Sequence, residues 1–240
     1  MSQTILITAA KEDSEKVLSQ LADEHIIHAP LEIYTERTGD AEIVEVLNEL
    51  NTFDNIVYSS KRNAIFFLQQ VESHDKMDAV KNSLNLAFDE STFTFLEDEG
   101  IPAVHPQNGS KAIDLVELML RLQRLGATLY PCGTHKREDF PGLLEELDMP
   151  VTELDVFDLE GPTEEALAAY QEDVKTKQPD TIIFHSRRSV NRTLAAFPDL
   201  EYENMRIISA DSGITNKLQE KGLSVDVEAD GSWETIAELV

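Results

Sequence analysis

One short pattern occurs twice in this chain of 240 residues. Residues 54–62 read DNIVYSSKR and residues 180–188 read DTIIFHSRR. Each copy contains an acidic residue, a run of β-branched and aromatic residues typical of a buried strand, a serine and two cations. A strand that ends in a serine and opens a helix brings backbone N–H groups and positive charge to one place. The pattern therefore predicts two half-sites for anions in a fold of strands and helices.

The charge balance makes these cations conspicuous. The chain has 46 acidic residues against 20 basic ones, a net charge of −26, which argues against binding to nucleic acid or to an anionic membrane. The single cysteine, Cys132, excludes an intrachain disulfide and a cysteine-based zinc site, and the six histidines show no ligand-like spacing. We expect a cytoplasmic location, because the sequence shows neither a signal-peptide pattern nor a membrane-spanning run. We also expect a monomer.

The order of the predicted elements repeats along with the pattern. Apolar spacing predicts helices at 12–24, 40–50, 90–99, 111–125, 143–147, 163–170 and 212–221, and a last helix that Ser232 caps. Ser110 is expected to cap the helix at 111–125 and Gly126 to end it. In each half, a helix leads into the repeated strand, and a second helix, a weak strand and a helix ending at glycine follow.

Neither half is complete as a continuous segment. The half that begins at Asp40 needs the strand at 127–130, whereas the half that begins at Thr163 needs the strand at 4–8 from the chain start. An inserted domain satisfies both requirements. We therefore expect one α/β domain at 36–154, and a discontinuous one that joins 1–33 to 158–240. Extended connectors at about 31–36 and 151–159 would join them.

Residues 131–138, which read PCGTHKRE, add a second motif. Together with the doubled Ser-[Lys/Arg]-Arg pattern, they make nearly the whole chain resemble the uroporphyrinogen-III synthase family. The resemblance implies two doubly wound, flavodoxin-like domains with parallel sheets, one inserted in the other and joined by a two-stranded connector. It also implies a lyase that closes linear hydroxymethylbilane to uroporphyrinogen III in haem biosynthesis, inverting the last pyrrole ring. No cofactor or metal is implied, and the substrate would bind between the domains.

A polycarboxylate such as hydroxymethylbilane is suited to cations and helix N-termini. From the repeated pattern, the candidate substrate-binding residues are Ser60, Lys61, Arg62, Asn63, Ser186, Arg187, Arg188 and Ser189. From the resemblance, they are Thr92, Thr134, Lys136, Gly213 and Ile214. Carboxylates at Asp89, Glu90 and Asp211 would lower the affinity for a polyanion if they faced it, so we expect them to cap helices and face water.

Three positions depart from the family pattern. Ala9 stands where the family pattern has an arginine, and Ile214 stands where the family pattern has a ligand-facing threonine. Phe157 stands where the family pattern has a tyrosine in the connector. The hydroxyl of that tyrosine could assist departure of the substrate's hydroxyl group, whereas phenylalanine has no proton to donate. The sequence therefore does not identify the catalytic residue. The candidates to replace that tyrosine are Tyr58, Tyr130 and His185.

These departures leave different functions open. One is an active uroporphyrinogen-III synthase. Another is a non-catalytic homologue that binds a tetrapyrrole or another polycarboxylate in the interdomain cleft. A third is a hinge-type binding protein for a small ligand, which shares paired α/β domains. Proteins of that third class are usually exported, and the missing signal peptide counts against it.

Overall fold

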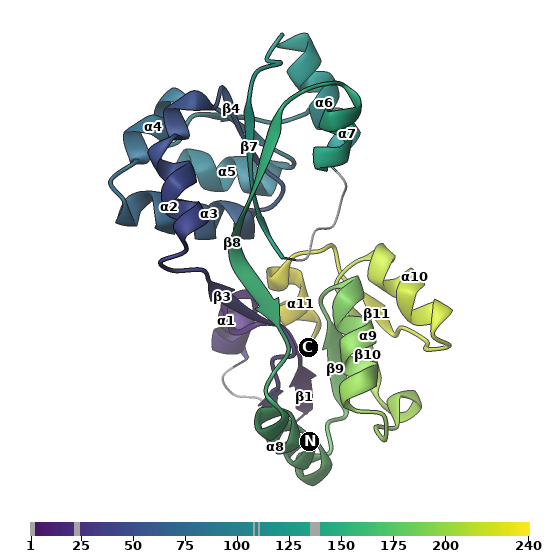
Figure 1. Ribbon diagram of the computed structural model, residues 1–240. Helices are drawn as coiled ribbons and strands as arrows, with labels where there is room; N and C mark the ends of the chain where they lie inside the picture. Colours follow the sequence, from purple (N-terminus) through teal and green to yellow (C-terminus); the bar gives the residue numbers. More distant parts are fainter. Residues whose placement is uncertain (1–2, 22–24, 108, 110, 135–139) are drawn as a thin grey trace. The chain divides into compact units, whose positions relative to one another are not determined.

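The computed structural model describes residues 3–21, 25–107, 109, 111–134 and 140–240 (Figure 1). Residue contacts divide the chain into two compact units. We call Met1–Tyr34 with Glu160–Val240 the discontinuous unit, and Thr35–Leu159 the inserted unit. The chain leaves the discontinuous unit after Tyr34 and returns to it at Glu160.

The discontinuous unit contains a five-stranded sheet in the order β11-β10-β9-β1-β2. Its strands are β1 (Thr4–Ile7), β2 (His25–His28), β9 (Thr181–Phe184), β10 (Arg206–Ser209) and β11 (Val227–Glu228). All four pairings are parallel. Counted along this unit, the strand order is 2-1-3-4-5, which is the doubly wound order of flavodoxin-like folds.

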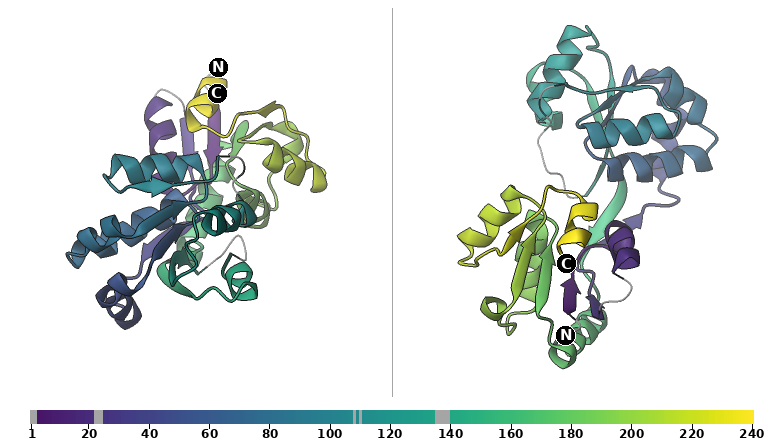
Figure 2. Two further views of the ribbon diagram at one scale, coloured as in Figure 1. Left: turned by 90° about the horizontal axis from the view of Figure 1, so that it is seen from above. Right: turned by 180° about the vertical axis from the view of Figure 1, so that it is seen from behind.

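Helices cover this sheet, and two pairs of them contact each other. They are α1 (Lys11–Gln20), α8 (Glu164–Lys177), α9 (Arg187–Ala196), α10 (Ser212–Glu220) and α11 (Trp233–Leu239), with a short 3-10 helix, η2 (Tyr202–Asn204). Helix α1 contacts α11, and both views of Figure 2 show them side by side; α9 contacts α10. Strands β1 and β9 are buried along nearly their whole length, as expected when helices cover both faces of a parallel sheet.

The inserted unit contains a six-stranded sheet in the order β3-β8-β7-β4-β5-β6. Its strands are β3 (Ile33–Glu36), β4 (Asn55–Tyr58), β5 (Leu84–Ala87), β6 (Ala103–Val104), β7 (Thr128–Gly133) and β8 (Val151–Glu160). The pairings from β8 to β6 are parallel. Counted from β7, these five strands again have the order 2-1-3-4-5, so this unit is a circular permutation of the other.

The two connectors become neighbouring strands at the edge of this second sheet, because β3 pairs with β8. The helices of the inserted unit are α2 (Ala41–Asn48), α3 (Lys61–Ser73), α4 (Met77–Asn82), α5 (Glu90–Asp98), α6 (Ala112–Arg121) and α7 (Phe140–Glu146), with the short 3-10 helix η1 (Leu50–Thr52). Helix α3 contacts α5, and α6 contacts α7. Ser110, the expected cap of α6, lies outside the described residues. Within the described ranges, the structure contains no helix of the length and apolarity that a membrane crossing requires.

The strand order fixes where a ligand would bind to each unit. In a doubly wound sheet the strand order reverses at one point, and ligands bind beyond the carboxyl ends of the strands there. That point lies between β1 and β9 in the discontinuous unit and between β7 and β4 in the inserted unit. Strands β4 and β9 are the strands of the repeated sequence pattern.

Candidate functional site

Both copies of the repeated pattern form a strand, a serine cap and a helix. The Ser60 side-chain oxygen accepts a hydrogen bond from the Asn63 backbone N–H at 3.3 Å and caps α3. Ser186 caps α9 in the same way, accepting from the Ser189 N–H at 3.0 Å. This confirms the local structure that the pattern predicts. It leaves the first cations of each helix, Lys61 and Arg187, exposed at the carboxyl edge of the sheet.

Cations from two helices meet at this edge of the discontinuous unit. Arg187 lies directly over Gly213 in α10, since a Cβ atom added to that glycine would come within 2.6 Å of Arg187 Nη2. A hollow of about 600 Å³ lies beside them. Its lining residues are Arg187, Arg188, Asn191, Gly213, Asn216, Lys217 and Glu220. Arg187, Arg188 and Lys217 carry positive charge, and Glu220 is the single acid among these lining residues. Glu220 is paired with Lys217 at 2.8 Å, so the two arginines leave the hollow with excess positive charge, which is suited to an anion.

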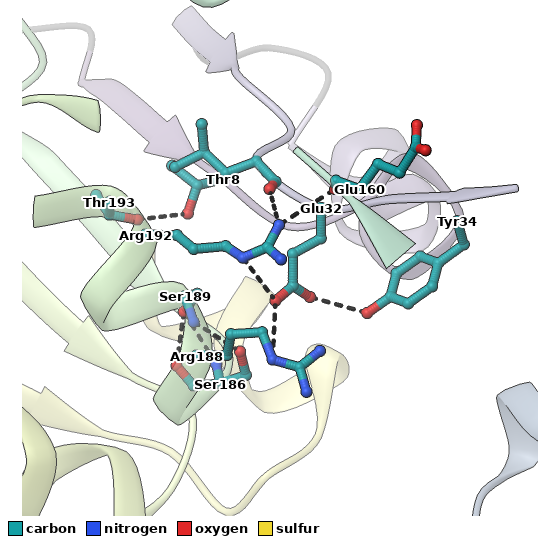
Figure 3. Close-up of polar contacts among 10 residues, drawn as sticks. Thr8, Glu32, Tyr34, Glu160, Ser186, Arg188, Ser189, Arg192 and Thr193 are labelled. Carbon is teal, nitrogen blue, oxygen red and sulfur yellow. Dashed lines mark hydrogen bonds and ion pairs between the residues drawn. The ribbon is translucent and has the colours of Figure 1, made fainter. Parts of the chain in front are cut away.

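A buried carboxylate, which the sequence did not single out, stands behind Arg188. Glu32 is only 4% exposed, and its Oε1 lies 3.9 Å from Nε of both Arg188 and Arg192 (Figure 3). Its Oε2 accepts a hydrogen bond from the Tyr34 hydroxyl at 2.8 Å. Arg192 also donates to the carbonyl oxygens of Leu31 and Glu160. It therefore joins α9 to the residue that begins the first connector and to the residue that ends the second.

The equivalent edge of the inserted unit is arranged differently. The ammonium of Lys61 lies 5.2 Å from the centre of the Phe95 ring, a cation–π contact. Asn63 is buried, and its amide donates to Ser59 Oγ at 2.8 Å and to the Pro131 carbonyl at 3.2 Å. Asn63 thereby ties α3 to β7, while Arg62 is half-buried.

The carboxylates near these edges do cap helices. Asp89 Oδ1 accepts from the Thr92 N–H at 2.8 Å, and Asp211 Oδ1 accepts from the Ile214 N–H at 2.9 Å. This confirms the expectation for the two aspartates. The same geometry turns the side chains of Thr92 and Ile214 inward, where both are fully buried. The expectation that these two side chains face a ligand is therefore corrected, since Ile214 belongs to the hydrophobic core of its unit.

The two candidate catalytic tyrosines are also core residues. Tyr58 is 0% exposed and donates to Asn85 Oδ1 at 3.2 Å, and burial raises the pKa of its hydroxyl far above the ordinary value. Tyr130 is 2% exposed and packs on Phe140, with ring centres 5.3 Å apart. Neither hydroxyl lies at the carboxyl edge, because both side chains point into the packing between sheet and helices.

The other candidates lie nearer the edges. His185 is half-buried, and its ring stacks on Trp233 at 6.1 Å between centres. Phe157 is buried against Phe66 at 4.8 Å between ring centres. It also closes over Gly133, where an added Cβ atom would overlap the ring. Phe157 therefore contributes packing rather than a proton donor.

The turn after β7 is described only at its start. Thr134 is exposed, its N–H donates to the Phe157 carbonyl at 3.3 Å, and its hydroxyl oxygen accepts from the Leu159 N–H at 3.4 Å. Lys136 lies outside the described residues. Ala9, where the family pattern has an arginine, is fully buried. Among the residues that the structure describes, no group of three His, Cys, Asp or Glu side chains is placed to hold a metal ion.

Comparisons with known proteins agree with this architecture. A mutant uroporphyrinogen III synthase from Thermus thermophilus has a TM-score of 0.70 at 11% identity, covering 99% of this chain and 97% of that chain. The uroporphyrinogen-III synthetase from Helicobacter pylori 26695 has a TM-score of 0.67 at 18% identity, covering 100% and 98%. At such identities these likenesses show a shared fold.

The sequence comparison goes further than the shared fold. No curated protein matches the sequence. A family model, described as uroporphyrinogen-III synthase HemD, matches residues 5–235. Because that match covers nearly the whole chain, the protein belongs to the uroporphyrinogen-III synthase family.

Proposed function

We propose that this protein is an active uroporphyrinogen-III synthase, a cofactor-independent lyase that closes hydroxymethylbilane to uroporphyrinogen III with inversion of the last pyrrole ring. The observation that carries the proposal is the pair of cationic helix starts beyond β4 and β9, at the point in each sheet where the strand order reverses. A chain of net charge −26 places positive charge at both of the edges where a doubly wound fold binds ligands.

The substrate carries a carboxylate on every side chain, and the cations at these edges can bind such groups. In the discontinuous unit, Arg187, Arg188 and Lys217 surround the hollow between α9 and α10. In the inserted unit, Lys61 and Arg62 open α3. Ion pairs and hydrogen bonds from helix N-termini favour carboxylates over neutral groups.

The reaction needs little covalent help from the protein. Loss of water from the terminal hydroxymethyl group gives an azafulvene cation, which attacks the last ring to form a spiro intermediate that then rearranges. The unassisted substrate cyclises without inversion, so the enzyme must hold the chain curled and protect the cation from water. Many carboxylate contacts distributed over the substrate serve that purpose. The protein would act on this small molecule in the cytoplasm as a monomer.

One assay tests the proposal directly. Purified protein is given hydroxymethylbilane made in situ, the products are oxidised, and the porphyrin isomers are separated. We expect isomer III in proportion to the protein added, whereas a protein-free control gives isomer I. Isomer I alone, from protein that is folded by circular dichroism, would refute the enzymatic proposal.

A second function is favoured by a specific observation. Phe157 offers no proton donor, and Tyr58 and Tyr130 are buried. A non-catalytic homologue would bind a tetrapyrrole at the same cations without turning over the substrate. Isomer I alone, together with saturable and salt-sensitive binding of uroporphyrin III, would support this second function instead.

A further inference from the structure

Arg188 lines the hollow beside α9 and α10, where the proposed substrate carboxylates would bind. An arginine side chain has many rotamers, so fixing its guanidinium at the moment of binding lowers the affinity for the ligand. A guanidinium that the protein already holds in place avoids this loss. The residue behind Arg188, Glu32, therefore bears on how tightly the hollow binds an anion.

We propose that Glu32 is a positioning residue for substrate binding, which holds the guanidinium of Arg188 so that the outer N–H groups face the hollow. The inference rests on the proposed binding of a polycarboxylate at this hollow and adds the residue that orients one of its cations. Glu32 acts through Arg188 and contacts no substrate itself. The sequence did not single it out, because it lies in a connector without a motif.

Glu32 is itself held firmly in the discontinuous unit. Its Oε2 accepts a hydrogen bond from the Tyr34 hydroxyl at 2.8 Å. The backbone just before it is tied to the carboxyl end of β1, where the Leu31 N–H donates to the Thr8 carbonyl at 3.1 Å. Only 4% of Glu32 is exposed. A carboxylate fixed in this way gives a cation beside it a defined place.

Two arginines share the other oxygen of Glu32. Nε of Arg188 and Nε of Arg192 each lie 3.9 Å from Oε1, which has no hydrogen bond within the described part of the chain. A buried carboxylate is costly unless it is paired, so the two guanidinium groups stabilise its charge. Because the carboxylate is buried, water and salt screen this attraction less than they screen ion pairs at the surface.

The two arginines are left with different tasks. Arg192 donates to the backbone carbonyls of Leu31 and Glu160, so its guanidinium is committed to the protein. Arg188 approaches Glu32 through Nε, and Figure 3 shows its two terminal nitrogens pointing away from Glu32. The Arg188 side chain is 31% exposed, so its outer part reaches solvent. Arg188 is therefore anchored on one side and available to a ligand on the other.

Glu32 could also act through its charge, and that effect has the opposite sign. A carboxylate near a site for a polyanion repels the ligand, so charge alone predicts tighter binding once Glu32 is neutralised. Orientation predicts weaker binding after the same change, because Arg188 is released. The two arginines already exceed the single charge of Glu32, which leaves the cluster formally positive. We therefore expect orientation to outweigh repulsion.

Glu32→Gln separates the two effects, because glutamine keeps the size of the side chain and an oxygen that can accept from Tyr34 but carries no charge. We expect Kd for uroporphyrin III, measured by titration at fixed ionic strength, to rise about fivefold. KM for hydroxymethylbilane should rise equally, with kcat within about twofold of the parent. The matched control is Glu164→Gln, at an exposed position of α8 in the same unit, which should change neither constant. Unchanged or tighter binding in Glu32→Gln overturns the inference.

A double-mutant cycle tests whether Glu32 acts through Arg188. Glu32→Gln should raise Kd less than about twofold in the Arg188→Ala background, but about fivefold in the Arg187→Ala background, since Arg187 lies over Gly213 instead. Equal effects in both backgrounds overturn the positioning role.

If Glu32→Gln does not fold, Arg188→Lys tests the same relationship from the other side. Lysine keeps the charge beside Glu32, but its ammonium lacks the second set of N–H groups that arginine presents to a ligand. We expect it to bind uroporphyrin III as weakly as Arg188→Ala, and parent-like binding overturns the inference. A parent protein that binds uroporphyrin III without forming isomer III refutes the synthase proposal alone, whereas a parent protein that neither binds nor turns over refutes both.

Discussion

Ser60 and Ser186 occupy equivalent positions in the two units, each between a buried strand and a helix that it caps. Their backbones are nearly identical, with φ of −164° and −156° and ψ of 157° in both. The two serines are equivalent although the strands of the two sheets follow one another along the chain in different, circularly permuted orders. A cap of this kind satisfies an N–H that would otherwise lack a partner and leaves the neighbouring N–H groups free for an anion.

Removing either cap should destabilise its own unit. We expect Ser60→Ala and Ser186→Ala each to lower the free energy of unfolding by about 1 kcal/mol, the usual cost of losing a serine cap. Urea unfolding measures this, with Ser224→Ala in an exposed loop as the control. A change in the cap variants no larger than in the control would contradict the capping role.

The exposed cations at the two edges should matter more than other cations of the same kind. Lys61→Ala combined with Arg187→Ala should lower kcat/KM for hydroxymethylbilane at least tenfold and weaken its dependence on salt, because carboxylate contacts are lost. The control pair is Lys177→Ala with Arg121→Ala, which removes equal charge from exposed helix positions. Equal losses in the two double variants would indicate a general charge effect rather than a site.

Tyr58 should prove structural. Tyr58→Phe removes the hydroxyl that donates to Oδ1 of buried Asn85, so this oxygen loses its hydrogen bond. The Asn85 side chain cannot turn to find another donor, because its amide nitrogen donates to the carbonyls of Val80, Ser83 and Pro102. We expect the free energy of unfolding to fall by about 1–3 kcal/mol. The kcat of the folded protein should stay unchanged, so chemical unfolding and turnover are measured on the same sample. A loss of kcat at unchanged stability would restore Tyr58 as a catalytic candidate.

His28 should make stability depend on pH. Burial lowers the pKa of its ring below 6.5, although the hydrogen bond to the Ala9 carbonyl and the charge of Glu12 oppose the shift. The folded protein then binds fewer protons than the unfolded chain, so stability is lost as the pH falls from about 6.5 through the lower folded pKa. Between pH 7.5 and 5, the wild type should lose more unfolding free energy than His28→Gln. Parallel curves would contradict this.

Much of the fold could be predicted because its signals are local. Runs such as those of β4 and β9 favour strands, and Ser232 is the N-cap of the last helix as expected. The errors fall where local signals are weak or compete. Helix α4 (Met77–Asn82) was not predicted, because it is only six residues long and half of its residues are polar. Helix α6 ends at Arg121 rather than 125, and the leucines beyond it are exposed although their composition favoured a longer helix.

The site was predicted less completely, and the reason is distance along the chain. The cations of the repeated pattern are identified by their own neighbours in sequence. Glu32 and Arg188 are separated by more than 150 residues, and neither carries a signal for the other. The side chains of Tyr58, Thr92 and Ile214 were misjudged for a related reason, because a strand or helix position does not reveal which face the sheet and helices cover.

The sequence alone therefore determined the doubled unit of strand, serine, cations and helix, the inserted order of the two folds and the resemblance to a family. All of these depend on residues close together or on the order of elements. Only the tertiary structure decided which side chains are accessible at the carboxyl edges. It buried Tyr58 and Tyr130, and it brought Glu32 and Tyr34 to Arg188, because the parallel order β9-β1-β2 places segments distant in sequence at one edge of a sheet.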